Sequence, residues 1–211
     1  MAEITNNGAN NVTNNLKSKK TKYIGIAAVV ILALWLISGY NGLVSKDESV
    51  SQAWANVQTD YQRRANLIPN LVKMIRKYTD YEGSTLKGVV AERSKATQVT
   101  IDASDLTEEK LQEFQKNRNE LEATLGKLLA ITEAYPELKA SKQFEQFNVQ
   151  LEGTENRIKK SLDDFNKAVT DYNLKVRRFP GSIIASIFGF DKKAKFEAEV
   201  GADKAPDIDE I

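Results

Sequence analysis

The chain has 211 residues, with 30 lysines and arginines against 29 aspartates and glutamates, and it contains no cysteine and no histidine. Because nucleic-acid-binding domains usually carry a clear basic excess, the balanced charge argues against a nucleic-acid partner. The absence of cysteine excludes disulfides, thiolate nucleophiles and iron–sulfur clusters. The absence of histidine removes the side chain that most often transfers protons near neutral pH and ligates transition metals. The composition therefore predicts a protein without enzymatic activity, cofactor or metal.

Residues 1–22 begin with an asparagine-rich stretch, MAEITNNGANNVTNNL. It offers little apolar surface to bury, so we expect residues 1–22 to form a disordered tail.

An uncharged apolar stretch, YIGIAAVVILALWLISGYNGLVS, occupies residues 23–45 between Lys22 and Lys46. A helix rises about 1.5 Å per residue, so this stretch spans about 34 Å and exceeds the roughly 30 Å hydrocarbon core of a bilayer. A buried core helix and a cleaved signal peptide are the alternatives. A signal peptide has a shorter apolar region that ends in an A-x-A-like site, and neither feature occurs here. The stretch therefore predicts a retained transmembrane helix.

The lysines around this stretch indicate its direction. Asp47 and Glu48 directly follow Lys46 on one side, whereas the other side is basic, with Lys17, Lys19, Lys20 and Lys22. Lysines and arginines near a span mark its cytoplasmic end. We therefore expect the N-terminus in the cytoplasm and the C-terminal domain outside it.

Residues 46–196 show the periodicity of helices. The first helix keeps an apolar stripe at three- and four-residue steps, formed by Val50, Trp54, Val57, Tyr61, Ile68, Val72 and Ile75. A turn is expected over 78–84, followed by a second helix to about Thr97 and a loop to about Ser104.

A third helix is expected to begin near Asp105 or Thr107 and to stop before Pro136, because a residue that precedes proline is pushed away from helical geometry. The fourth helix repeats apolar residues every seven positions, as in a left-handed coiled coil, at Phe144, Leu151, Ile158, Phe165, Tyr172 and Phe179. The pattern predicts an all-α fold, an antiparallel up-and-down four-helix bundle over 46–196 preceded by one N-terminal transmembrane helix. The acidic residues 197–211 are expected to form a disordered tail.

Several segments carry a more specific signal. They are YNGLVSKDESVSQAWANVQTDYQRRANLIPNLVKMIRKYTDYE, VVAERSKAT, EAYPELKAS, LEGTENRI and FN…DYN…FPGSIIASIFGF, and they run from about Tyr40 to Phe196. Together these segments resemble the LemA family. The chain departs from the family pattern in KKSLDDFN, residues 159–166, where Phe165 replaces a tyrosine. The resemblance implies a bacterial single-pass membrane protein with a four-helix domain, hence the cytoplasmic (inner) membrane, and it implies no catalytic activity.

The stretch QRRANLIPNLVKMI, residues 62–75, places Arg63, Arg64 and Pro69 inside the first helix of the body. Pro69 cannot donate a hydrogen bond to the Ala65 carbonyl, so we expect a kink. A buried arginine needs a partner. We expect Arg63 and Arg64 to pair with carboxylates from the set Glu92, Glu120 and Glu155, or to bond the carbonyl that Pro69 leaves free. The alternative is that they bind an anion or a carboxylate of a partner protein.

Glutamates within the predicted helices are also candidate metal ligands, since bundles bind metals through inward-facing carboxylates. The candidates are Glu92, Glu120, Glu133, Glu152 and Glu155. Di-iron bundles usually add Glu-x-x-His motifs, and no histidine is present. Surface charge and salt bridges are therefore the favoured interpretation.

The segment GSIIASIFGFDKKAKF, residues 181–196, combines an apolar cluster with lysines that follow it. Its apolar members are Ile183, Ile184, Ile187, Phe188 and Phe190. The favoured interpretation is a helix that caps the bundle core. The alternative is an amphipathic segment in the membrane interface, with its lysines near anionic headgroups.

The leading functional hypothesis is a membrane-anchored scaffold or adaptor of the cell envelope, which forms homo-oligomers and binds other envelope proteins. One alternative is a membrane-shaping protein that grips a single lipid bilayer with its anchor and residues 181–196. The other is a metal- or ligand-dependent regulator or an enzyme, which the lack of histidine and cysteine disfavours.

Overall fold

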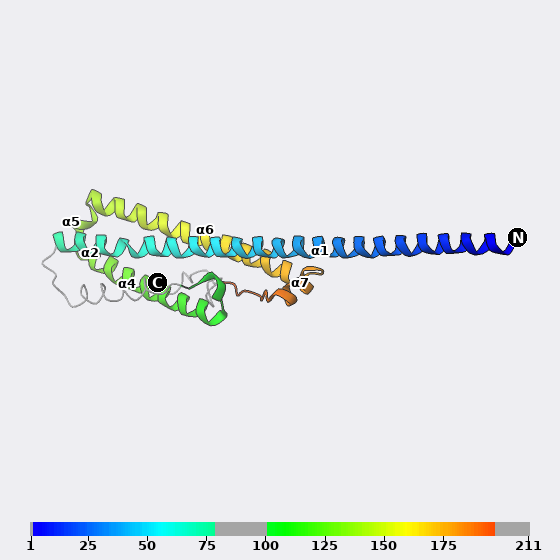
Figure 1. Cartoon of the computed structure of the whole chain (residues 1–211). Helices are drawn as coiled ribbons and strands as arrows, with labels where there is room; N and C mark the ends of the chain where they lie inside the picture. Colours follow the sequence, from blue (N-terminus) through cyan, green and yellow to red (C-terminus); the bar gives the residue numbers. More distant parts are fainter. Residues whose placement is uncertain (1, 79–100, 197–211) are drawn as a thin grey trace, which may run out of the picture. The chain divides into compact units, whose positions relative to one another are not determined.

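The computed structural model describes residues 2–78 and 101–196, and for residues 2–19 and 21 it describes the backbone only. The second predicted helix, Glu92 and the predicted tail 197–211 lie outside the described residues. Every regular element in the described ranges is a helix (Figure 1). The all-α prediction is therefore confirmed.

The helices follow one another as α1 (Ala2–Ala65), α2 (Leu67–Tyr78), the 3-10 helix η1 (Ala103–Asp105), α4 (Glu108–Glu133), α5 (Pro136–Lys139), α6 (Lys142–Arg177) and α7 (Gly181–Phe188). They are divided between two compact units. The first unit comprises residues up to 45 together with 176–191, and the second comprises 46–175 together with the residues from 192 onward.

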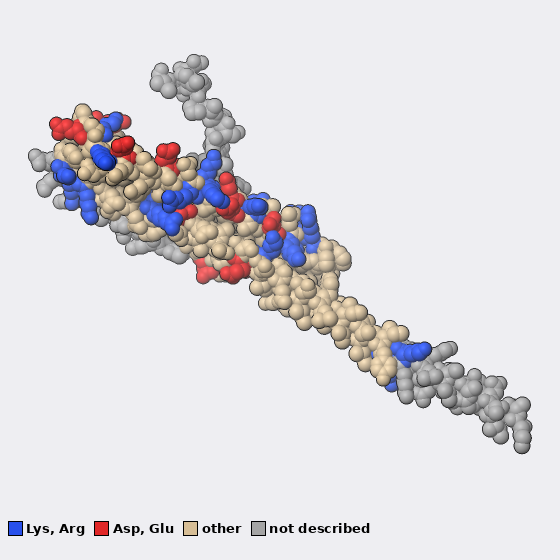
Figure 2. Space-filling view, turned by 90° about the horizontal axis from the view of Figure 1, so that it is seen from above, with Lys and Arg blue, Asp and Glu red and all other residues tan. Residues whose placement is uncertain are grey.

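In the first unit, α1 begins at Ala2, so the segment for which the sequence predicts a disordered tail is helical here. The uncharged stretch 23–45 continues the same helix, and its most apolar part has no buried residue. Figure 2 shows this stretch free of charged side chains, with basic side chains at its N-terminal end. The structure thus contains a helix long and apolar enough to cross a membrane.

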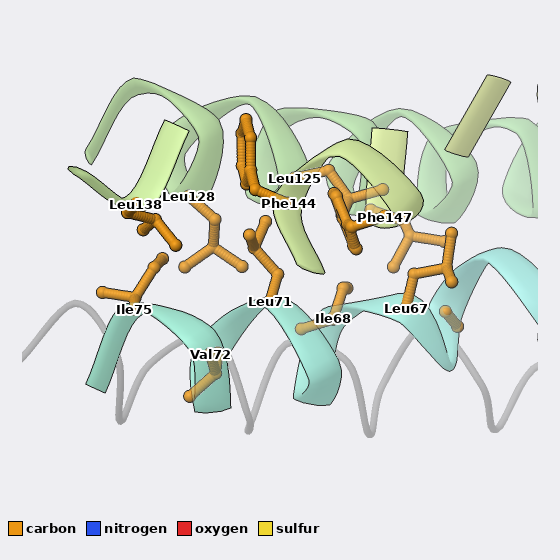
Figure 3. Close-up of a cluster of buried hydrophobic side chains, with 12 residues drawn as sticks. Leu67, Ile68, Leu71, Val72, Ile75, Leu125, Leu128, Leu138, Phe144 and Phe147 are labelled. Carbon is orange, nitrogen blue, oxygen red and sulfur yellow. The ribbon is translucent and has the colours of Figure 1, made fainter. Parts of the chain in front are cut away.

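The core of the second unit has two parts. At one end, side chains of α2 pack against α4, α5 and α6 in a cluster of Ala65, Leu67, Ile68, Leu71, Val72, Ile75, Leu121, Leu125, Leu128, Leu138, Phe144 and Phe147. Figure 3 shows Leu71 and Ile75 of α2 pointing toward Leu128 and Leu138. Burial of these side chains removes apolar surface from water, at about 25 cal/mol for each Å².

The other part of this core is aromatic and centres on Trp54 of α1. Its indole ring lies 5.0 Å from the ring of Phe114 on α4 and 5.2 Å from that of Phe165 on α6, measured between centroids. The Phe196 ring stacks on it at 6.2 Å. The indole N–H donates a 2.9 Å hydrogen bond to the Ile101 carbonyl. Trp54 thus buries its apolar ring and also has a hydrogen-bond partner for its one polar group.

These contacts fix the directions of the helices in the second unit. Trp54 meets Phe114 at one end, and Ile75 meets Leu128 at the other, so α4 runs in the same direction as α1 and α2. Phe165 lies beside Trp54, whereas Phe144 belongs to the α2 cluster. The helix α6 therefore runs in the opposite direction, as Figure 1 also shows.

Two helix boundaries follow from local chemistry. The Thr107 side chain caps α4 by accepting a bond from the Lys110 amide at 3.4 Å, as serine and threonine do at helix N-termini. Asn66 separates α1 from α2, because Pro69 lacks the N–H that would continue the helical ladder to the Ala65 carbonyl. The predicted starts and stops near Thr107 and Pro136 are confirmed.

Two asparagines on α6 hold the chain that follows α7. The Asn173 side-chain amide donates to the Lys193 carbonyl at 2.8 Å, and its oxygen accepts from the Lys193 amide at 3.0 Å. Asn166 makes the same pair of bonds with Phe196, at 2.9 and 2.8 Å. Each carboxamide thus pairs with both backbone groups of one residue in this non-helical segment, as a neighbouring strand would.

Replacing Asn166 by alanine should destabilise the protein, because it leaves both backbone groups of Phe196 without their partner. We expect a loss of about 1–3 kcal/mol in the free energy of unfolding, measured by urea unfolding of the full chain in detergent micelles. Asn119→Ala, at an exposed position on α4, serves as control and should change the value by about 0.5 kcal/mol or less. Equal small effects of the two substitutions would contradict this role.

Candidate functional site

Arg64 stands at the centre of a charged cluster in the second unit. Its Nη1 atom lies 2.5 Å from a carboxylate oxygen of Glu155 on α6 and 3.3 Å from one of Glu122 on α4. Arg118, also on α4, donates to the same Glu122 oxygen from Nε at 3.0 Å. The guanidinium of Arg64 therefore links three helices beside the break between α1 and α2.

The side chains of this cluster differ in how far they are buried. The Arg64 side chain is only 12% exposed, whereas those of Glu122 and Glu155 are 33% and 53% exposed. Tyr61 lies one turn earlier on α1, with the Arg118 guanidinium 5.9 Å from its ring centroid, within the range of a cation–π contact. Among the described residues, neither the Tyr61 hydroxyl nor Arg64 Nε has a hydrogen-bond partner. Burial raises the pKa of the Tyr61 hydroxyl well above its ordinary value.

Arg63 lies in a different environment from its neighbour. Its side chain is 55% exposed and pairs with Asp60 at 3.1 Å, one turn away on the same helix. It borders a shallow groove of about 250 Å³ between α1 and α6, lined by Asn56, Thr59, Asp60, Arg63, Arg157, Lys160, Ser161 and Asp164. This groove offers basic and acidic groups side by side, a surface suited to a polar partner.

The predicted site residues are thus partly brought together. Arg64 and Glu155 meet, whereas Arg63 points into the groove and Pro69 sits in the first turn of α2. Sequence reasoning missed Glu122 and Arg118, although their i, i+4 spacing on α4 is a recognisable pairing signal. Among the described residues, no three carboxylates gather as metal ligands would, and Glu120, Glu133 and Glu152 are exposed.

The apolar segment after α6 forms α7, which belongs to the first unit together with the uncharged stretch of α1. The bundle-core cap favoured from the sequence stays a prediction. Ile184 is buried, and its Cδ1 atom would lie 2.1 Å from a Cβ added at Gly39, so only glycine allows this approach without a shift. Ile183, Ile187 and Phe188 are exposed, and Phe190 is half-buried.

Comparison with known proteins adds a family to this geometry. Residues 53–209 match the LemA family. Magnetosome protein MamQ 1 of Paramagnetospirillum magneticum is 26% identical over 204 residues, covering 88% of this chain and 74% of its own. Protein LemA of Metamycoplasma hominis is 25% identical over 158 residues, covering 75% of this chain and 68% of its own. Neither the family description nor these names state a catalytic activity.

Removing the Arg64 guanidinium should destabilise the protein more than removing that of Arg63. Arg64→Met keeps much of the side-chain volume but leaves Glu122 and Glu155 without their shared cation, at a cost of about 1–2 kcal/mol because both carboxylates are part-exposed. Arg63→Met, the matched control, should cost less, about 0.5–1 kcal/mol, because Arg63 is 55% exposed although its partner Asp60 is only 13% exposed. Urea unfolding of the two variants measures the difference, and equal losses would show that the cluster is not structural.

The buried Tyr61 hydroxyl predicts a stability change at alkaline pH. Its pKa is raised by burial above the ordinary 10.0, so the folded chain holds this proton more tightly than the unfolded chain. The resulting stability is complete below pH 10.0 and is lost as the pH rises beyond it. Tyr61→Phe removes this term, so unfolding free energies measured up to about pH 11 should fall less steeply in the variant than in the parent. Parallel curves for the two proteins would refute the assignment.

Proposed function

This chain belongs to the LemA family, and we propose that it is a non-enzymatic, single-pass membrane protein that acts as a scaffold or adaptor in the bacterial cell envelope. Its helical body would bind other envelope proteins and further copies of itself. The residue types most used for catalysis, histidine and cysteine, are absent from the sequence, which supports binding over chemistry.

One helix carries the proposal. The residues of α1 before Lys46 include an uncharged stretch with no buried residue in its most apolar part. Those after it supply Val50, Trp54 and Val57 to a protein core, each at most 1% exposed. Apolar side chains that no protein surrounds are stable in the hydrocarbon of a bilayer. The anchor and the binding body would therefore share one continuous helix.

The lysines that precede the apolar stretch support a cytoplasmic N-terminus and an extracytoplasmic body. Lys17, Lys19, Lys20 and Lys22 lie close to that end, whereas Lys46 alone lies close to the other. This difference in the number of nearby lysines favours the proposed orientation in the cytoplasmic membrane.

The body would be completed as an up-and-down four-helix bundle by the helix expected before Thr97. The directions of α2 and α4 support this arrangement, because helices that run in the same direction need a connection that returns along their length. Between the turn expected over 78–84 and Thr97, the connection has room for a helix of about 20 Å. This connection, with α6, would give four alternating helices.

We place the partner-binding surface at the groove that Arg63 borders, because Arg64 is occupied by two carboxylates. In the groove, Arg63 and Lys160 pair with Asp60 and Asp164 on their own helices, through contacts of 3.1 and 2.7 Å. Both basic side chains are more than half exposed, and pairs made by such side chains contribute little to stability. They can therefore exchange their partners for those of a docking protein at small cost.

A photoreactive residue in place of Arg63 tests this proposal in intact cells. We expect ultraviolet light to produce an adduct with a defined envelope protein or with a second copy of this chain, identified by mass spectrometry. A distinct protein supports an adaptor, and self-adducts support a homo-oligomeric scaffold. The matched control replaces Lys116, an exposed basic residue on α4 outside the groove.

Equal adduct patterns from both positions, or no adducts from either, would contradict the groove as a binding surface.

The orientation of the chain in the membrane is checked in the same cells with single-cysteine variants, since the chain has no cysteine of its own. A membrane-impermeant maleimide should label Lys160→Cys from outside the cytoplasmic membrane and should not label Ser18→Cys. The reverse labelling would overturn the proposed orientation.

A further inference from the structure

The helix α7 has one face against α1 and another that no described residue covers. Ile184 and Ala185 are at most 3% exposed, whereas Ile183, Ile187 and Phe188 are 46%, 63% and 51% exposed. Phe179, just before the helix, is 81% exposed. Large side chains of this kind rarely gather on a surface in contact with water unless the surface binds something.

The buried face fixes where α7 lies along α1. Ile184 sits over Gly39, the residue whose missing side chain makes room for it. The Phe188 ring centroid lies 4.9 Å from that of Tyr40, and the Phe190 centroid lies 5.8 Å from it. Both Gly39 and Tyr40 belong to the uncharged stretch 23–45. Phe188 must therefore share the depth that Tyr40 has relative to a bilayer.

Tyr40 lies near the C-terminal end of that stretch, six positions before Lys46. Tyrosine rings at the ends of membrane spans occupy the interface between hydrocarbon and headgroups. A helix held beside such a ring lies in the same layer. The exposed face of α7 would then meet acyl chains rather than water.

The charges around α7 fit the same layer. Gly181–Phe188 contains no charged residue, whereas Arg177 and Arg178 precede it and Asp191 and Lys192 follow it, all four with exposed side chains. Lys193 is engaged with Asp47 and the Ala103 carbonyl, at 2.8 and 2.7 Å. An uncharged apolar helix that directly follows two exposed arginines fits a segment that lies on an anionic membrane.

We propose that the exposed face of α7, formed by Ile183, Ile187 and Phe188, is a second membrane-contact surface, which lies in the lipid interface of the bilayer that α1 crosses. Arg177 and Arg178 face the lipid phosphates. This inference rests on the proposed function, because it requires α1 to span the membrane. Two contacts with one bilayer are also what a membrane-shaping protein needs.

Site-directed spin labelling of the full chain tests the proposal, since any introduced cysteine is the single one in the sequence. Ile187→Cys reports on α7, and Ile183→Cys repeats the measurement at a second position of the same face. Val149→Cys is the matched control, because Val149 is apolar, lies on α6 and is 66% exposed against 63% for Ile187. Val30→Cys reports on the span.

Each labelled protein is reconstituted into vesicles of phosphatidylglycerol and phosphatidylethanolamine, and the nitroxide is probed with oxygen, which enters lipid, and with a nickel chelate, which stays in water. We expect the ratio of oxygen to nickel accessibility at 187 and 183 to shift from the value at 149 toward that at 30. If the label at 187 is as accessible to the nickel chelate as the label at 149, the proposal is overturned. A lipid-like label at 30 in the same experiment would still support α1 as a membrane anchor.

Two further outcomes are distinguishable from these. A label at 187 shielded from both reagents would show that a second copy or another protein covers α7, which also overturns the proposal. A water-like label at 30 would instead refute the membrane span and, with it, the proposed function.

Discussion

Burial of the Trp54 ring is the interaction on which the second unit depends. The indole lies between Phe114 of α4 and Phe165 of α6, and Phe196 stacks on it from the segment after α7. Its N–H bonds the Ile101 carbonyl just before η1. One side chain of α1 thus contacts four other parts of the chain. Aromatic packing supplies the apolar burial, and the single hydrogen bond fixes the orientation of the ring.

Polar side chains add hydrogen bonds and ion pairs to the contacts of this aromatic core. Asn166 and Asn173 bind the amide and carbonyl of Phe196 and Lys193, so these backbone groups of a non-helical segment have partners. Near the break that Pro69 causes between α1 and α2, Arg64 links three helices through its ion pairs with Glu122 and Glu155. These groups are committed to structure.

The first unit has a different constraint. It carries more apolar side-chain surface than its described residues bury. In α1, residues such as Ile24, Val29 and Leu34 are 69%, 66% and 62% exposed. Near the C-terminal end of the stretch, Gly39 and Tyr40 contact Ile184 and Phe188 of α7 and Phe190 just after it. Large apolar surfaces of this kind are stable where the solvent itself is apolar. The proposed anchor and the proposed lipid contact of α7 follow from this one requirement.

Much of this protein could be predicted from local patterns. The uncharged stretch 23–45, the apolar stripe through Trp54, the cap at Thr107 and the stop before Pro136 all depend on near neighbours in the chain, and each appears in the structure. The family could also be recognised, because its motifs lie in continuous segments.

Contacts between distant residues were decided only by the tertiary structure. Nothing in the sequence says that Arg64 takes Glu122 rather than Glu120, since both lie on one helix and only its rotation brings one carboxylate inward. The same holds for Ile184 and Gly39, which are far apart in the chain and meet because a glycine leaves space for a methyl group. The sequence by itself determined the all-helical class, the apolar stretch and the family. Which side chains meet, and hence which are free to bind, required the packed chain.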